Sequence, residues 1–330
     1  MAKQYGQRLK ILCILDILRR YSDEQHPLNA SEICDYLENM GVSAERKSVY
    51  NDIAALSDFG YDIVKSGSPR GWFLGAREFE EPEIYLLADA VRAAKFITVG
   101  KSRELIGKLD SFLSNAQAAK REKRVYFDAA AKCSNEEIYY NIDKISDEIN
   151  RRKKIRLDYA SRELSADREI VRREREMTVS PYALTWQDDH YYLIGNYEKY
   201  NNLIHLRVDR MRSVEITCLE ARPFSEVSEY DDYFNVSDYT KRLFSMYGGV
   251  TAEIELSCNK KIIEQVLDRF SEDIFIKNVT DSEFGFSVKA VLSDALVTWI
   301  LNYGENIRVI APEELKLRLL KRIKEVEKLY

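Results

Sequence analysis

Glycine, proline, cysteine and histidine are all scarce in this 330-residue chain, which holds 13 Gly, 6 Pro, 5 Cys and 3 His. With 45% hydrophobic residues as well, the composition excludes collagen-like, low-complexity and disordered chains. Long hydrophobic runs are also missing, because no stretch approaches the ~18 apolar residues of a membrane span. The start of the chain lacks an apolar segment followed by a small-residue cleavage site, so we expect no signal peptide.

The cysteines are too widely spaced to suggest a disulfide framework. None forms a Cys-x-x-Cys pair and their total is odd, which is typical of proteins whose thiols stay reduced. They are Cys13, Cys34, Cys133, Cys218 and Cys258. These features predict a cytoplasmic protein that makes no contact with a membrane.

Motifs of catalysis are missing as well. The chain has no glycine-rich phosphate loop and no Gly-x-Ser-x-Gly turn. Its histidines, His26, His190 and His205, lack the ligand spacing of a zinc site. We therefore expect no catalytic residue, no metal and no cofactor.

The net charge of −5 argues against a protein that coats nucleic acid through bulk positive charge. Only residues 150–215 carry more Lys and Arg than Asp and Glu, so a cationic site elsewhere has to be local. At about 150 residues per domain, the length predicts two or three domains.

Residues 1–76 are expected to begin with three helices. Apolar residues recur at helical spacing in the first helix, at Ile11, Ile14, Leu15 and Leu18. Asn29 followed by Glu32 is the capping-box pattern of a second helix. Ser43 is expected to cap a third helix, which Gly60 ends.

A β-hairpin is expected next, with strands Tyr61–Val64 and Gly71–Leu74 joined by turn-forming residues. Three helices and a hairpin are the layout of a winged helix-turn-helix, which binds duplex DNA through its third helix. Arg and Lys can contact phosphates or guanine, and Asn can contact adenine. The candidate DNA-binding residues are Arg46, Lys47, Ser48, Tyr50 and Asn51 in the third helix and Arg70 in the wing. The alternative is an ordinary three-helix core with a polar surface.

The run Val42–Leu56, followed by Phe59-Gly60, resembles the recognition helix of bacterial transcriptional regulators with an N-terminal winged helix. The resemblance implies binding to double-stranded operator DNA. Those proteins usually carry Arg where this chain has Asn51, so the operator sequence does not follow from it.

Residues 77–135 are expected to form a helical connector, because their apolar residues keep helical spacing. After a further helix the period changes to two, which predicts several short strands and a small barrel over residues 136–222. Tyrosines and arginines then share sheet faces, an arrangement suited to an anionic ligand with a ring that can stack.

Three blocks of this middle region, Ser180–Leu184, Tyr191–Gly195 and His205–Met211, resemble the WYL domain. The family's Trp-Tyr-Leu is Tyr191-Tyr192-Leu193 here. The resemblance implies an Sm-like or SH3-like β-barrel that senses a nucleic-acid or nucleotide-like effector. Carried over by position, the ligand-binding residues are Tyr159, Ser180, Tyr182, His190, Tyr192, His205, Arg207 and Arg210. Arg207 and Arg210 are the expected phosphate contacts.

Residues 245–330 show the element order β-α-β-β-α-β-α, which predicts a ferredoxin-like domain. The domain resembles the extension that commonly follows WYL domains, through Asp268-Arg269-Phe270, Trp299, Gly304 and Pro312-Glu313. The resemblance implies a role in forming a homodimer.

The fold class expected is therefore α+β with several domains, and the function expected is a DNA-binding transcriptional regulator that responds to an effector. An accessory protein that binds single-stranded nucleic acid in a defence or RNA-processing system remains an alternative. A protein-interaction adaptor is a third.

Overall fold

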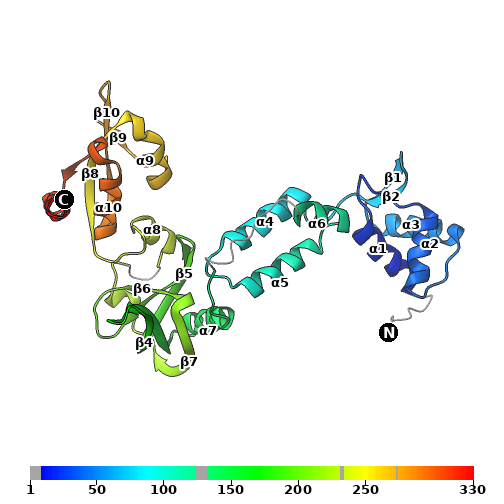
Figure 1. The fold of residues 1–330 in the computed structure, drawn as a ribbon, viewed down its shortest axis with the longest axis horizontal. Coiled ribbons are helices and arrows are strands. Elements are labelled where there is room, and N and C mark those ends of the chain that lie inside the picture. Colours follow the sequence, from blue (N-terminus) through cyan, green and yellow to red (C-terminus); the bar gives the residue numbers. More distant parts are fainter. Residues whose placement is uncertain (1–8, 123–131, 231–233, 273) are drawn as a thin grey trace. The chain divides into compact units, whose positions relative to one another are not determined.

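The computed structural model describes residues 9–122, 132–230, 234–272 and 274–330. It is a mixed α+β chain that divides into two compact units, residues 1–136 and 137–330 (Figure 1). Within the described ranges, no helix is long and apolar enough to cross a membrane. Residues 123–131 of the expected connector lie outside the described residues.

The first unit begins with three helices and a two-stranded antiparallel hairpin. These are α1 (Lys10–Tyr21), α2 (Ala30–Asn39), α3 (Arg46–Phe59), β1 (Ile63–Gly67) and β2 (Arg70–Leu74). Their apolar faces meet in one core, where Ile14, Ile33 and Val49 are fully buried. Trp72 of β2 closes that core, so the hairpin is part of the same packed body.

The helix ends follow the predicted signals at two of three places. The capping box of Asn29 and Glu32 is confirmed, and Gly60 ends α3 with a φ of 114°. The prediction that Ser43 caps α3 is wrong, because Glu45 precedes the helix in extended conformation and makes no side-chain cap. Val42 is buried, so the chain leaves the core before α3 can start.

The hairpin is tighter than predicted. Its strands extend to Gly67 and from Arg70, so that only Ser68 and Pro69 form the turn and Gly67 lies opposite Arg70. The turn-forming residues from Lys65 onward are therefore partly in strand β1. Arg70 consequently sits beside the tip of the hairpin.

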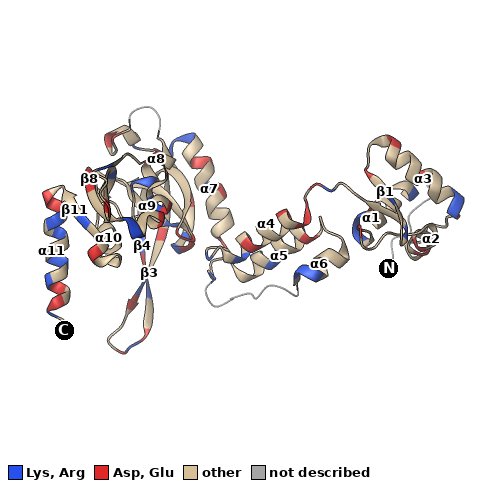
Figure 2. Ribbon diagram, turned by 90° about the horizontal axis from the view of Figure 1, so that it is seen from above, with Lys and Arg blue, Asp and Glu red and all other residues tan. Residues whose placement is uncertain are grey.

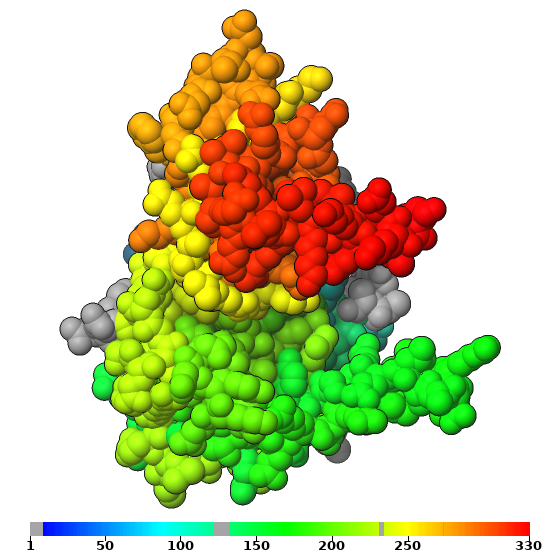
Figure 3. All heavy atoms as spheres, turned by 90° about the vertical axis from the view of Figure 1, so that its left-hand side faces the viewer, coloured from blue at the N-terminus to red at the C-terminus, as the bar shows by residue number. Residues whose placement is uncertain are grey.

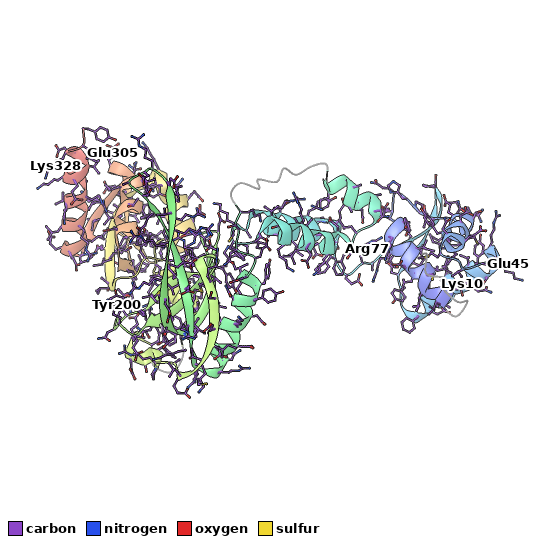
Figure 4. The ribbon with its side chains drawn as sticks, turned by 60° about the horizontal axis from the view of Figure 1, so that its bottom comes forward. Lys10, Glu45, Arg77, Tyr200, Glu305 and Lys328 are labelled. Atoms are coloured by element: carbon purple, nitrogen blue, oxygen red, sulfur yellow. The ribbon has the colours of Figure 1, made fainter. Side chains whose placement is uncertain are left out.

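Three connector helices follow, α4 (Glu81–Ala93), α5 (Val99–Asp110) and α6 (Asn115–Glu122). Arg77, labelled in Figure 4, precedes α4 and donates to the backbone carbonyls of Arg19, Ser22 and Phe112 at 2.9, 2.7 and 3.2 Å. Burial lowers the pKa of Arg77, with Asp23 opposing that effect. The guanidinium thus ties the end of α1 to the connector.

The second unit contains a five-stranded antiparallel sheet in the order β6-β5-β4-β3-β7. Its elements are α7 (Ile138–Arg151), β3 (Lys153–Leu164), β4 (Ile170–Gln187), β5 (His190–Tyr197), β6 (Ile204–Arg207) and β7 (Met211–Glu220). Helix α7 packs on the sheet through buried Ile138 and Ile145. Asn141 and Lys144 of this helix also donate hydrogen bonds to backbone carbonyls of β7.

Strands β3 and β4 are much longer than the sequence predicts. Apolar alternation indicates strands only near Ile155–Tyr159 and Tyr182–Trp186, whereas the ladder pairs every residue from Ile155 to Leu164 with β4. The outer part, residues 160–175, is a two-stranded ribbon that stands away from the rest of the second unit (Figures 2 and 3). Its residues are mostly exposed and charged, so the ribbon buries no face that a periodic apolar pattern could mark.

The end of the chain forms a four-stranded antiparallel sheet in the order β11-β8-β10-β9. Its elements are β8 (Val250–Asn259), α9 (Ile263–Phe270), β9 (Ile276–Lys277), β10 (Glu283–Leu292), α10 (Asp294–Asn302), β11 (Ile307–Ala311) and α11 (Glu313–Glu327). This is the predicted element order. Leu256, Phe286 and Ile300 are buried in its core.

Residues 221–249 connect the two sheets and carry the short helix α8 (Val236–Lys241). They pack on β4 and β5 in a cluster that includes Ile194, Leu243 and Met246, with Val291 of the second sheet. In Figure 3 this yellow segment lies between the green and the orange parts. One face of the five-stranded sheet is therefore partly covered.

Candidate functional site

The first turns of α3 present a polar surface to solvent. Arg46, Lys47, Tyr50, Asn51 and Ala54 are all exposed, while Val49, Ile53 and Leu56 face the core. The start of α3 is blue in Figure 2, which marks its two basic residues. This is the face that the helical period predicts to be free of the core.

Ser48 differs from its neighbours, because it is half-buried and its hydroxyl accepts a hydrogen bond from Lys10 of α1. Lys10 also pairs with Asp52 of α3 at 2.8 Å. Ser48 therefore lies on the side of α3 that holds α1, and the exposed surface consists of the other candidates of this helix.

Two contacts join the polar face of α3 to its surroundings. The guanidinium of Arg46 donates to the hydroxyl of Ser31, in the first turn of α2, at 3.2 Å. The ring of Tyr50 meets Trp72 of β2 edge-on, with centroids 4.9 Å apart. The face of α3 thus adjoins the start of α2 through Arg46 and the hairpin through Tyr50, and Arg70 of the same hairpin is exposed. Sequence reasoning missed Ser31 and Trp72, because contacts between elements leave no local pattern.

In the second unit, strand register places several candidate ligand residues on one face of the sheet. Tyr192 of β5 lies opposite Arg207 of β6. Two residues further along the two strands, Ile194 lies opposite His205, so both pairs share one face of the sheet. His190 starts the same strand, and its ring meets Tyr192 edge-on. The structure therefore brings His190, Tyr192 and Arg207 together.

Arg207 is held in place by Asp209 through two hydrogen bonds of 3.0 and 2.7 Å. Burial alone would lower the pKa of Arg207, but the bond to Asp209 and its charge outweigh that effect and raise it. Burial raises the pKa of Tyr192 even though Arg207 opposes the change. The result is a fixed guanidinium beside a neutral phenol, which can hold an anionic group.

Ser180 and Tyr182 belong to a different site. The Tyr182 hydroxyl donates to the Arg222 carbonyl at 2.7 Å, and the Arg222 amide donates to the Ser180 hydroxyl at 3.0 Å. Burial raises the pKa of Tyr182 to about 12. Tyr182 lies where the β4–β5 register shifts, so it leaves the regular alternation of the strand.

An open pocket of about 480 Å³ lies beside Tyr182. Phe224 and Phe234 add aromatic rings to its lining, and Arg152 and Arg222 add cations. The Arg222 guanidinium is already bonded to Glu226 and Asn201, at 2.9 and 3.1 Å. Sequence reasoning missed this pocket, because its lining residues from Glu220 to Ser225 and Phe234 carry no periodic pattern.

Tyr159 is joined to the Arg207 site, whereas Arg210 lies in the turn that follows it. Tyr159 pairs with Arg175 of β4 and with Met211 of β7, and its hydroxyl accepts from the Arg207 amide at 3.2 Å. Arg210 is exposed in the short turn between β6 and β7. Tyr159 therefore supports the backbone of Arg207, while Arg210 is open to solvent.

His205 lies under the connecting segment rather than in the open. Its Nε2 is 2.9 Å from the Tyr239 hydroxyl of α8. Burial lowers the pKa of His205 to about 4, although a backbone bond to Met246 opposes the shift. The imidazole is therefore neutral near pH 7 in the folded chain.

We expect this histidine to make the chain less stable in acid. An unfolded histidine titrates near pH ~6.5. Between pH ~6.5 and about 4, the histidine is protonated in the unfolded chain but neutral in the folded chain. Lowering the pH through this range should therefore reduce the free energy of unfolding by on the order of 3 kcal/mol. Urea unfolding at a series of pH values should show this loss in the wild type and a weaker pH dependence in His205→Gln. Equal slopes for the two proteins would contradict the expectation.

Among the described residues, no group of three or more His, Cys, Asp and Glu is arranged to hold a metal ion. All five cysteines are free thiols.

Comparison with known proteins identifies two domains in the second unit. Residues 140–216 match the WYL domain, and residues 249–326 match the WCX domain. No curated protein matches the chain. A solved structure, Proteasome accessory factor B/C (PafBC) of Arthrobacter aurescens, is 16% identical with a TM-score of 0.27, covering 96% of this chain and 48% of that one. The chain thus spans about half the length of that structure, and a TM-score this low adds nothing to the functional argument.

Proposed function

Because the chain contains a WYL domain followed by a WCX domain, we propose that it is a DNA-binding transcriptional regulator that responds to an effector. The observation that carries this proposal is the exposed face of α3. Arg46, Lys47, Tyr50 and Asn51 turn away from the core and border the hairpin, which is the arrangement by which a winged helix-turn-helix meets duplex DNA.

The proposed domain organisation has four parts. Residues 1–76 are the winged helix-turn-helix, 77–135 the connector, 136–222 an Sm/SH3-like barrel and 245–330 a ferredoxin-like domain. The antiparallel strand order β6-β5-β4-β3-β7 supports a curved sheet for the third part, and the order β11-β8-β10-β9 with two crossing helices supports the last. Free thiols agree with a cytoplasmic location.

The effector proposed is a nucleic acid or nucleotide-like molecule bound by the WYL domain. Arg207 and Tyr192 would receive its phosphate, and exposed Arg210, three residues further along the chain, would add a second cation. The aromatic pocket with Tyr182, Phe224 and Phe234 offers rings on which a base can stack. Binding regulates only if the effector has different affinity for two arrangements of the DNA-binding part, which is the requirement for any allosteric coupling.

We also propose that the regulator is a homodimer through its WCX domain. Helix α11 leaves Leu317, Leu320, Ile323 and Val326 between 43% and 60% exposed, at intervals of three residues. Because a step of three residues turns an α-helix by about 300°, these side chains wind around α11 instead of lining one face, and each neighbouring pair leaves apolar surface that a second copy can cover. A solution mass of about twice 38.5 kDa is the expected result.

Genome-wide mapping of bound DNA in cells tests the proposed function. The expected result is a small number of discrete duplex sites that share a sequence and lie upstream of genes. If the protein is recovered without any enriched site, it is not a sequence-specific regulator.

A further inference from the structure

The outer part of the β3–β4 ribbon carries three rows of side chains on one face, and each row joins two residues that lie directly opposite each other. The row nearest the sheet is acidic, the middle row joins a small residue to an acidic one, and the outer row is basic. They are Asp158 with Glu176, Ala160 with Glu174, and Arg162 with Arg172. Residues opposite each other share a face, and so do residues two apart along a strand.

Two of these rows place like charges directly opposite each other, which destabilises a sheet. No ion pair of Arg162 or Arg172 exists within the described part of the chain. On the other face, by contrast, Arg173 pairs with Glu163 at 2.7 Å and Arg175 lies over the ring of Tyr197. Two cations lie beside the acidic row: Arg156, which is bonded to Glu215 at 3.0 Å, and Arg212 of β7, which lies opposite Asp158. Within the described residues, the outer basic row is thus left without an ion pair, and nearer the sheet three carboxylates of the ribbon face stand beside two arginines.

These rows are complementary to themselves when the ribbon is turned end over end. A two-fold axis at the Ala160 row brings the basic row of one copy onto the acidic row of the other, and the reverse contact follows by symmetry. Four residues separate the two rows along a strand, or about 13 Å at ~3.3 Å per residue. Ala160, on the axis, is small enough to let the two faces approach. The same axis brings the two copies of Glu174 together, so the two acidic-to-basic contacts have to outweigh that one repulsion.

We propose that this ribbon face binds the same face of a second copy of the chain. Nucleic acid is the less favoured occupant, because Asp158, Glu174 and Glu176 on the same face would repel phosphates. The contact is independent of α11. The ribbon contact and the α11 contact can occur in the same dimer only if both share one two-fold axis. The experiment therefore has to detect the ribbon contact separately from the α11 contact.

A cross-link at position 160 provides that local report. In a Cys218→Ser background, which removes the exposed native thiol, Ala160→Cys is treated with a short bis-maleimide. The two copies of residue 160 would lie about 10 Å apart across packed sheets, within reach of the reagent. Ala166→Cys at the ribbon tip is the matched control, because its two copies would lie about 40 Å apart. Equal cross-linking at both positions overturns the proposal.

Charge reversal then tests the pairing of the rows. Arg162→Glu with Arg172→Glu makes both rows acidic, and Asp158→Arg with Glu176→Arg makes both rows basic. Each double variant alone should lose about tenfold or more of the cross-link at position 160, because like charges then face each other. A mixture of the two variants should recover it, since acidic rows then meet basic rows in both contacts.

Failure of the mixture to recover the cross-link would overturn the proposal, provided that thermal unfolding shows both variants folded. The proposal is also overturned if the wild type binds a labelled DNA duplex but no second copy at this face, and if DNA binding is lost only when Arg162 and Arg172 are replaced. Unfolding of one variant leaves the comparison of Ala160→Cys with Ala166→Cys as the deciding result.

Discussion

Replacing Arg46 and Lys47 together by alanine is expected to lower affinity for operator DNA by about a hundredfold while leaving the chain folded. Both residues are exposed at the start of α3, and Arg46 donates one hydrogen bond, to the hydroxyl of Ser31. A side chain that contacts a base contributes about 1–3 kcal/mol, and ~1.4 kcal/mol corresponds to a factor of ten. Electrophoretic mobility shift at fixed salt measures the change.

A matched control removes the same charge elsewhere in the first unit. Lys101 and Lys108 lie on α5 and pair with Glu104, whose pKa they lower to about 2. Lys101→Ala with Lys108→Ala should therefore reduce DNA binding far less than the α3 double variant. Equal losses would mean that binding depends on total charge rather than on the α3 face.

Replacing Arg207 and Arg210 by alanine is expected to abolish the response to the effector while operator binding persists. Hydrogen bonds to a charged group contribute about 1.5–3 kcal/mol each, so loss of both cations should weaken effector binding by about a hundredfold or more. Binding of a short labelled single-stranded oligonucleotide and of a labelled nucleoside triphosphate, measured by fluorescence anisotropy, checks this.

The structure adds a requirement to this test. Arg207 and Asp209 are largely buried, with side-chain exposures of 23% and 11%, so removing Arg207 takes the ion-pair partner from a poorly hydrated carboxylate. We therefore expect the Arg207 and Arg210 variant to unfold at a lower temperature than the wild type. Effector binding should be measured well below the unfolding temperature of the variant. Arg168→Ala with Lys199→Ala, two exposed cations in turns between strands of the same sheet, is the control. A full response in the Arg207 and Arg210 variant would remove these residues from the site.

Helices and the C-terminal element order could be predicted because each buries one face. The 3.6-residue period of α1 and α3 and the alternation of β8 and β10 record that burial directly. The ribbon of β3 and β4 could not be predicted, since residues such as Arg162 and Arg172 are exposed in strands that are joined mainly by backbone hydrogen bonds and bury no apolar face. The start of α3 was also predicted wrongly, because the burial of Val42 in the core decides where the helix begins.

The candidate sites show the same division. Exposure of Arg46, Lys47, Tyr50 and Asn51 follows from the helical period. The inward contact of Ser48 depends on Lys10, a residue of another helix. In the sheet, the register shift between Pro181 and Ala183 assigns Tyr182 to a pocket apart from Arg207. Local patterns therefore predict which side chains leave the core, and tertiary contacts decide which of them meet.

The central claim is that the chain recognises a duplex DNA sequence through α3. Footprinting of the purified protein on the DNA upstream of its own operon, with single-stranded DNA of the same sequence as competitor, tests this most directly. The account predicts a discrete protected duplex segment that survives the competitor and disappears in the Arg46 and Lys47 variant. Tight binding to the single strand with no protected duplex segment would contradict it.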